Sequence, residues 1–302
     1  MRMLWFGFVF TMLVAAFASG DDVRLKVDHA TVCSSDLNAM QDAFSHLGLR
    51  TDYGGPHARG GTHMAVLGFE DGSYLELIGP QRAGAETDSD WSRLMLADAG
   101  ACAWAVGSAN IDADVKRLKA SGFPVSGPIA GGRKTPDGKL LQWLVAAVGT
   151  AKAGATLPFT IQDRTPREWR VKPSVSSREK GLTGVEAVVL GVKDLETAIG
   201  LFRKAYGWPA PVLEDHPQFG AKLAHFSGTP VILATPLGAD SWLTKRLSDL
   251  GESPIAFLLG AHDFEKATHQ ATGSPESWFG RRIAWFDAKK LKGARIGIIA
   301  AR

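Results

Sequence analysis

Apolar and polar positions along this chain follow a pattern that occurs more than once. Residues 25–33 alternate as a half-buried strand does, and Asp36 then precedes a helical pattern that ends at Gly48. The segment 185–207 repeats this order, with Asp194 at the matching place before its helix. An internal repeat of this kind predicts a fold built from copies of one supersecondary unit.

Each copy continues into further strands. In the first copy, residues 63–69 and 73–78 form the arms of a predicted hairpin around Glu70-Asp71-Gly72. Similar patterns of strand, capped helix and closing strands begin near residues 101, 184 and 254. A single unit leaves one face of a curved sheet uncovered, and pairing two units covers it. The chain is therefore predicted to have an α+β fold of four βαβββ units grouped two and two.

The N-terminus has the composition of a targeting segment. Arg2 precedes an apolar run over residues 4–18, which ends in the small-residue pattern Ala16-Phe17-Ala18. This order is typical of a secretory signal peptide, here residues 1–20, and predicts a periplasmic or secreted protein with no stable membrane insertion after cleavage. The alternative is an uncleaved membrane anchor through residues 4–18.

The remaining chain is long enough for two domains. A polar stretch over residues 166–181 contains two prolines and a Ser-Val-Ser-Ser run, and it is the best candidate for a linker. The predicted domains are therefore residues 21–165 and residues 182–302.

Charge and cysteine content narrow the function classes. A net charge of +3 without a basic tract argues against a nucleic-acid partner. The chain has no Gly-rich phosphate loop, no Gly-x-Ser-x-Gly elbow and no His-Glu-x-x-His helix, which disfavours nucleotide enzymes and hydrolases. Its two cysteines, Cys33 and Cys102, lie in apolar strand-like segments and are predicted to be buried free thiols, too far apart to bridge.

Several segments together resemble the vicinal oxygen chelate superfamily, and more closely its glyoxalase-like branch. They are Val27-Asp28-His29, Gly61-Thr62-His63, the hairpin strand 71–78 and the closing strand 157–161. The resemblance implies paired βαβββ units that form glyoxalase/bleomycin-resistance-like domains with cupped mixed sheets. It also implies a divalent metal in the cup and a small-molecule substrate with adjacent oxygens. Edge strands of such sheets could also pair between two copies of the chain and form a homodimer.

Two residues fall at metal-ligand positions of that family. His29 is at the first-strand position and Glu76 at the fourth-strand position, and an imidazole with a carboxylate suits Zn, Fe, Mn or Ni. Strand alternation places His29 on one face with Thr31, and Glu76 on one face with Tyr74. Glu76 or His63 would then move a proton during catalysis.

Other candidate residues would contact the substrate. His57 and Arg59 lie in a glycine-rich loop, and Arg59 could hold a carboxylate or phosphate. Trp104 and Gln162, from the second unit, complete the set of candidate substrate contacts. In the second half Glu186 could replace a histidine ligand, whereas an isoleucine stands where Glu76 stands, so that half is expected to be degenerate.

Two functions follow from these expectations. The first is a metal-dependent lyase or isomerase in which the metal acts as a Lewis acid on the substrate. The second is a non-catalytic protein that sequesters a small molecule in the same cup. Because only two good ligands are found where an active site usually has three, the second function remains open.

Overall fold

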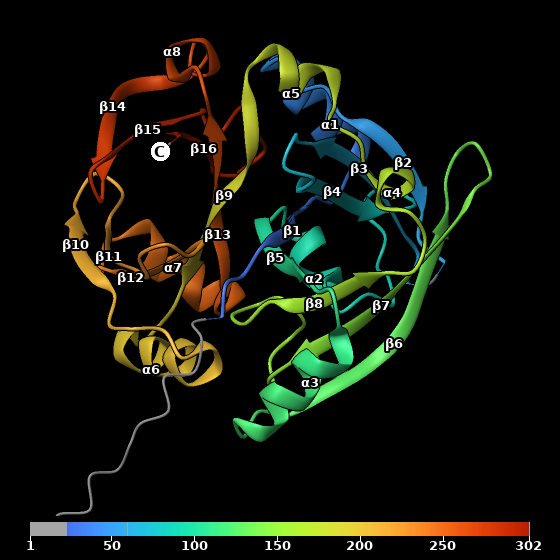
Figure 1. The fold of residues 1–302 in the computed structure, drawn as a ribbon. Coiled ribbons are helices and arrows are strands. Elements are labelled where there is room, and N and C mark those ends of the chain that lie inside the picture. Colours follow the sequence, from blue (N-terminus) through green and yellow to red (C-terminus); the bar gives the residue numbers. More distant parts are fainter. Residues whose placement is uncertain (1–22, 59, 302) are drawn as a thin grey trace, which may run out of the picture.

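The computed structural model, described for residues 23–58 and 60–301, contains two sheets of eight strands each (Figure 1). The first sheet has the strand order β2-β3-β4-β1-β5-β8-β7-β6, in which the two units meet at β1 and β5. Its strands are β1 (Val27–Cys33), β2 (Asp52–Pro56), β3 (Thr62–Gly68), β4 (Tyr74–Pro80), β5 (Gly100–Gly107), β6 (Val125–Lys134), β7 (Leu140–Val148) and β8 (Phe159–Asp163).

The second sheet repeats this topology, with the order β10-β11-β12-β9-β13-β16-β15-β14. The four βαβββ units and the α+β class expected from the sequence are therefore confirmed. Its strands are β9 (Leu182–Gly191), β10 (Val212–His216), β11 (Ala221–His225), β12 (Val231–Pro236), β13 (Ser253–Ala261), β14 (Thr272–Trp278), β15 (Arg281–Trp285) and β16 (Ile296–Ala300).

The helices within the described residues are few and short. They are α1 (Leu37–His46), α2 (Ser92–Leu96), α3 (Ile111–Ala120), α4 (Arg167–Arg170), α5 (Val175–Glu179), α6 (Leu195–Tyr206), α7 (Trp242–Leu250) and α8 (Phe264–Ala267). Among the described residues, no helix has both the length and the apolar character needed to span a membrane. The apolar run over residues 4–18 lies outside the described residues.

The helix starts follow the sequence closely. Asp36, Asn110, Asp194 and Asp263 each accept a hydrogen bond from a backbone N–H of the first turn of their helices. By contrast, α4 and α5 form inside the stretch 166–181, which the sequence pattern showed only as polar.

One hydrophobic core joins the two sheets. In Figure 1 the central strands β1 and β5 lie beside β9 and β13, and buried side chains from both sheets belong to the same cluster. On β1, Ala30 and Val32 point into this core, as do Leu75 and Leu77 on β4. The opposite faces of β1 and β4 are therefore left to form the hollow of the first sheet.

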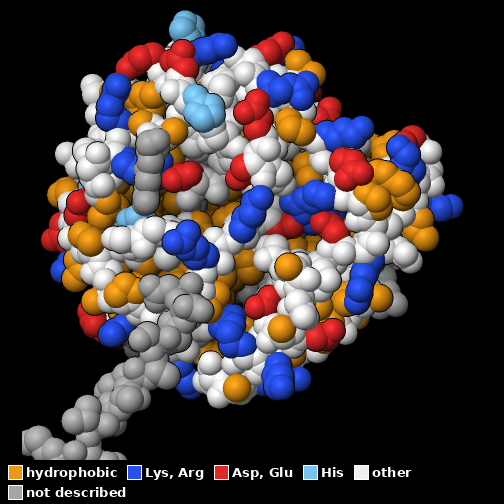
Figure 2. All heavy atoms as spheres, viewed as in Figure 1, with side chains coloured by type: hydrophobic (Ala, Val, Ile, Leu, Met, Phe, Trp, Pro, Cys, Tyr) orange, Lys and Arg blue, Asp and Glu red, His pale blue; other side chains and the backbone are white. Residues whose placement is uncertain are grey.

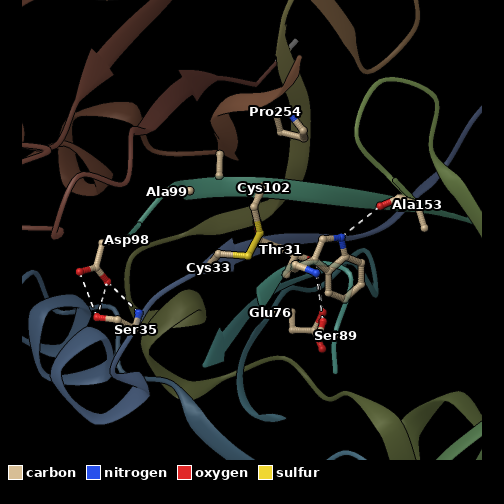
Figure 3. Close-up of a disulfide and its surroundings, with 12 residues drawn as sticks. Thr31, Cys33, Ser35, Glu76, Ser89, Asp98, Ala99, Cys102, Ala153 and Pro254 are labelled. Carbon is tan, nitrogen blue, oxygen red and sulfur yellow. Dashed lines mark hydrogen bonds between the residues drawn. A yellow bond between two sulfur atoms is a disulfide. The ribbon is translucent and has the colours of Figure 1, made fainter. Parts of the chain in front are cut away.

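The two cysteines form a disulfide, which corrects the prediction of free thiols too far apart to bridge. Cys33 on β1 and Cys102 on β5 have Cα atoms 5.9 Å apart, because these strands are antiparallel neighbours whose register shifts between Thr31 and Val32 (Figure 3). The bond therefore joins the two units of the first sheet at their junction.

Two edge strands were missing from the sequence pattern. β6 contains glycines at 127, 131 and 132 and a proline at 128, and most of its side chains are partly or fully exposed. β14 begins with the polar run 272–277 and is exposed over most of its length. An edge strand with one pairing side tolerates Gly and Pro and needs no apolar alternation, so its hydrophobic signal is weak.

The hollow of the second sheet is filled by apolar side chains. Strand register matches His29 with Ala187 and Glu76 with Ile232, and both second-sheet residues belong to a hydrophobic cluster into which α7 packs. Glu186 therefore corresponds to Asp28 rather than to His29, which corrects the expected register by one residue. Its carboxylate forms an ion pair with Arg281 at 2.7 Å.

Charged groups of both signs are mixed on the face shown in Figure 2, with hydrophobic side chains between them. On this face the lysines and arginines do not gather into one continuous region. On this face, therefore, charges of opposite sign are mixed locally and not separated into two regions.

Candidate active site

His29 and Glu76 face the same hollow, on the face opposite the shared core. Parallel pairing of β1 with β4 sets His29 opposite Tyr74 and Thr31 opposite Glu76. The rings of His29 and Tyr74 stack with centroids 4.9 Å apart, and the rings of His29 and Phe159 form a T-shaped pair with centroids 5.3 Å apart. The imidazole is therefore held in one orientation by aromatic contacts on two sides.

Glu76 lies between two imidazoles. Its Oε2 is 3.7 Å from Nε2 of His29 and accepts a hydrogen bond from Thr31 Oγ1 at 3.2 Å, while its Oε1 is 3.4 Å from Nε2 of His57. Burial alone would raise the pKa of Glu76. The hydrogen bond from His57 and the charge of His29 outweigh burial and lower this pKa to about 2. Glu76 is therefore a carboxylate at neutral pH.

Asp28 orients His29 from the other side. Its Oδ1 lies 2.6 Å from Nδ1 of His29, and its oxygens also accept hydrogen bonds from Arg170 at 2.8 and 2.9 Å and from Arg167. Burial raises the pKa of Asp28, but the hydrogen bonds and charges of His29 and Arg170 have the larger effect. The pKa of Asp28 therefore lies far below its ordinary range. An ionised Asp28 accepts the Nδ1–H of His29, which leaves Nε2 facing Glu76.

Tyr74 completes the buried network. Arg170 Nη1 donates to the Tyr74 hydroxyl at 2.9 Å, and the guanidinium groups of Arg167 and Arg170 lie within 6 Å of the Tyr74 ring. Burial raises the pKa of this phenol well above its ordinary value. Tyr74 therefore stays neutral and acts as a packing surface for His29.

The imidazoles and Glu76 form the polar floor of a cavity of about 820 Å³. This volume suits a small organic molecule. Most of the wall is apolar, and its apolar side chains include Met64, Trp91, Ile129, Leu140, Trp143, Val145, Phe159 and Ile161. A buried carboxylate between two imidazoles at the end of an apolar cavity is an arrangement typical of a functional site.

Comparison with known proteins identifies the family. The family model of the glyoxalase-like domain matches residues 27–206, which is more than half of the chain. The chain belongs to the glyoxalase-like domain family. Among curated proteins, none matches this chain.

A solved structure shows the same fold over nearly the whole chain. A hypothetical protein from Staphylococcus aureus is similar with a TM-score of 0.60 and 15% identity, over 92% of this chain and 100% of its own. Methylmalonyl-CoA epimerase from Mycobacterium tuberculosis is similar over 40% of this chain and 90% of its own, with a TM-score of 0.36 and 19% identity.

The donor set is incomplete for the metal that the glyoxalase-like resemblance implies. His29 and Glu76 converge as expected, but each imidazole lies nearest a different oxygen of Glu76. No group of three or more His, Cys, Asp or Glu side chains within residues 23–58 and 60–301 is arranged to hold a metal ion. Catalytic metal sites usually have three protein ligands, so the donors present do not make such a site on their own.

The other candidate residues are only partly brought together. His57 lines the cavity, whereas His63 points to the opposite side of β3, toward Tyr53. Trp104 is fully buried, and its indole N–H donates to the carbonyl of Thr156. Gln162 accepts from the backbone N–H of Ile111 at the start of α3. Neither of these last two residues lines the cavity, and Arg59 lies outside the described residues.

Three arginines at the site were not singled out from the sequence. Arg167 and Arg170 lie on α4 and reach back to Asp28 on β1, and Arg133 lies on the edge strand β6. A signal for the first two existed in the Arg-Glu-Trp-Arg segment after Pro166, where Arg167 and Arg170 share one helix face. Their acidic partner is more than 130 residues away, and the local pattern could not reveal it.

Proposed function

We propose that the cavity of the first sheet binds a small molecule with adjacent oxygen atoms, and that the protein is a lyase or isomerase that moves a proton on this molecule. The observation that carries the proposal is the ionised Glu76 buried between Nε2 of His29 and Nε2 of His57. Burying such a group is costly for folding, and groups of this kind concentrate at functional sites.

The imidazoles are the proton carriers in this proposal. A pKa of about 2 makes Glu76 a weak base, and its role is to stabilise the positive charge of a protonated imidazole. Because Asp28 takes the Nδ1–H of His29, the proton from the substrate goes to Nε2. A carbonyl beside the C–H bond acidifies that bond, and His57 on the other carboxylate oxygen can return the proton.

A divalent metal would have His29 and Glu76 as its protein donors. Such an ion polarises a substrate oxygen and lowers the energy of a developing negative charge. Since the described donor set lacks a third ligand, no step of this proposal depends on a metal.

Proton exchange in D₂O tests the proposal without knowledge of the substrate. A panel of aryl-substituted 2-hydroxy ketones and 2-oxo acids is incubated with the protein, and exchange of the proton beside the carbonyl is followed by NMR. We expect exchange that falls by about 10²-fold or more in His29→Gln and Glu76→Gln. His63→Gln is the matched control and should exchange at the wild-type rate, since this side chain points away from the cavity.

The second candidate function is sequestration of a small molecule. The mainly apolar wall of the cavity and the absence of a third metal donor among the described residues favour it. Panel members that bind without exchange, with unchanged affinity in His29→Gln, would support sequestration and contradict the enzyme.

We also propose that the protein is exported. The disulfide between Cys33 and Cys102 supports this, because disulfides form and persist in oxidising compartments and are rare in the cytosol. Fusion of residues 1–20 to a reporter that is active only outside the cytoplasm tests the proposal. A silent reporter, with the full-length protein recovered from the cytoplasm, would contradict it.

A further inference from the structure

Arg133 is a buried cation at the wall of the cavity. Only 3% of its surface is exposed, and its side chain lies beside Gly54, where any larger residue would collide with Met64. Its guanidinium donates to two backbone carbonyls, those of Gly54 and Arg170. A guanidinium has five N–H donors, so most of its hydrogen-bonding capacity is not used by the described residues.

Arg133 also lacks an acidic partner. No carboxylate of the described residues lies within ion-pair distance of its guanidinium, whereas Arg167 and Arg170 both pair with Asp28 and Asp163. Burial lowers the pKa of Arg133, with partial compensation from Tyr74 and Glu76. Buried charges in proteins are normally paired, and an unpaired guanidinium is costly for folding unless something else neutralises it.

The charged side chains that line the cavity differ in their partners. They are Glu76, Asp88, Arg133, Lys134 and Arg170. Arg170 pairs with Asp28 and Asp163, and Glu76 lies between two imidazoles. Arg133 is buried and has no acidic side chain of the described residues within ion-pair distance, so an anionic group of a ligand would supply the missing partner.

The cavity walls beside Arg133 indicate the shape and polarity of the rest of the ligand. Gly131 lies two residues before it and lets the Trp143 ring lie against β6, since a Cβ there would come within 2.4 Å of the indole nitrogen. Trp91 and Phe159 form a second aromatic wall, with ring centroids 6.2 Å apart. Flat apolar surfaces on two sides suit a planar or alicyclic body.

From these observations we propose that the ligand is an amphipathic carboxylate, whose carboxylate is bound by the Arg133 guanidinium and whose apolar body lies against Trp143, Trp91 and Phe159. The inference rests on the proposed function in one respect, which is that this cavity is the ligand site. Arginine is well matched to such a ligand, because its planar fork forms two parallel hydrogen bonds with a carboxylate.

A matched pair of probes tests this assignment. Naphthalene-2-carboxylate and naphthalene-2-carboxamide have the same body and differ in charge, and their dissociation constants are measured by calorimetry at pH 7.5. We expect the carboxylate to bind about ten- to a hundredfold more tightly than the amide, and this preference to disappear in Arg133→Gln. The neighbouring Lys134 also lines the cavity but is exposed, so Lys134→Gln should keep the preference.

Further variants keep the test interpretable. Trp143→Ala should weaken both probes equally, which places them in the cavity. Arg133→Lys retains the charge and should keep part of the preference even if Arg133→Gln unfolds, as judged by circular dichroism. Equal affinities of the two probes for the wild type, or a preference that survives in Arg133→Gln, would overturn the assignment. Either result leaves the proton-exchange proposal standing, because that assay depends on His29 and Glu76.

Discussion

Nδ1 of His29 lies 2.6 Å from Oδ1 of Asp28, and this contact fixes which nitrogen of the imidazole faces the cavity. Asp28 is itself fixed by Arg170, whose guanidinium spans both carboxylate oxygens at 2.8 and 2.9 Å. A chain of charged contacts therefore runs from α4 through Asp28 to the ring that faces Glu76. The orientation of His29 depends on a helix outside its own sheet.

Asp28→Asn should change the protonation pattern of His29. An asparagine can offer its NH₂ group to Nδ1, which would move the proton of the neutral ring to Nε2. We expect wild-type His29 to carry a proton on Nδ1 and the variant to carry it on Nε2, as read from ¹⁵N shifts of labelled histidine. The rate of proton exchange on the substrate panel should also be lower in Asp28→Asn than in the wild type. An unchanged ¹⁵N pattern would show that Asp28 does not set the tautomer.

Arg170→Met should destabilise the fold strongly. Arg170 is 5% exposed and pairs with both Asp28 and Asp163, so its removal leaves buried carboxylates with fewer partners. Breaking a buried pair in this way costs about 3–5 kcal/mol of unfolding free energy, which urea denaturation measures. The exposed Arg164 provides the control variant Arg164→Met, whose loss should be near zero. A loss in Arg170→Met as small as in the control would contradict the network.

Glu76 makes stability depend on acid pH. Because its folded-state pKa of about 2 lies below the ordinary 4.5, ionised Glu76 stabilises the fold at neutral pH. This contribution is complete above about pH 4.5 and is lost as the pH falls toward 2. The shift corresponds to about 3 kcal/mol.

Comparison with Glu76→Gln isolates this effect. The stability advantage of the wild type over Glu76→Gln should shrink by most of that amount between pH 7 and pH 2, as measured by urea denaturation. Glu70→Gln, on the exposed turn between β3 and β4, should differ from the wild type by a small amount throughout. A constant difference for Glu76→Gln across this range would show that its environment does not favour the carboxylate.

The sequence could predict the parts of this fold that repeat. The Asp and Asn residues before the helices, the hairpin around Gly72 and the alternation on β1 and β4 are local patterns, and each has a local physical cause. They located the four units, whereas the shared hollow of His29 and Glu76 was predicted from the resemblance to the vicinal oxygen chelate superfamily. The weak strands β6 and β14 lacked such a pattern, because edge strands need little apolar alternation.

Contacts between distant segments could not be predicted in the same way. Arg170 meets Asp28 only after β1 and α4 have been placed together, and Arg133 reaches the cavity from an edge strand that the pattern did not show. The disulfide depends on the pairing and register of β1 and β5, neither of which the sequence specifies. Residue types alone indicated the polar floor of the site but not its orientation or charge balance.

Loss of the disulfide should lower stability without moving the site residues far. Cys33 and Cys102 are 69 residues apart in sequence, and in the chain-entropy model a closed loop of this length contributes about 4 kcal/mol. The bond lies close to the site, since Cys102 Sγ contacts the Thr31 carbonyl and Thr31 donates to Glu76 (Figure 3). We expect the Cys33→Ala/Cys102→Ala protein to unfold at lower urea concentration than the wild type.

Reduction of the wild-type protein distinguishes the effect of losing the disulfide from the effect of the two alanine substitutions. Wild-type protein with a reducing agent should approach the stability of the double variant, whereas the double variant should not respond to the agent. Mass spectrometry after alkylation should find no free thiol in the oxidised wild type. Two alkylated cysteines in protein purified without reductant would contradict the disulfide.

Metal retention provides the most direct test of the two-donor floor. His29 and Glu76 offer two protein ligands, and no third His, Cys, Asp or Glu of the described residues, His57 included, is arranged with them to hold a metal ion. Catalytic metal sites usually bind their ion through three protein ligands, and two ligands hold it more weakly. Zn²⁺, Mn²⁺, Fe²⁺ or Ni²⁺ added to the purified protein should therefore be removed by dialysis against metal-free buffer. Elemental analysis measures what remains. Retention of one equivalent, lost in both His29→Ala and Glu76→Ala but kept in His63→Ala, would show instead that the floor rearranges around a metal.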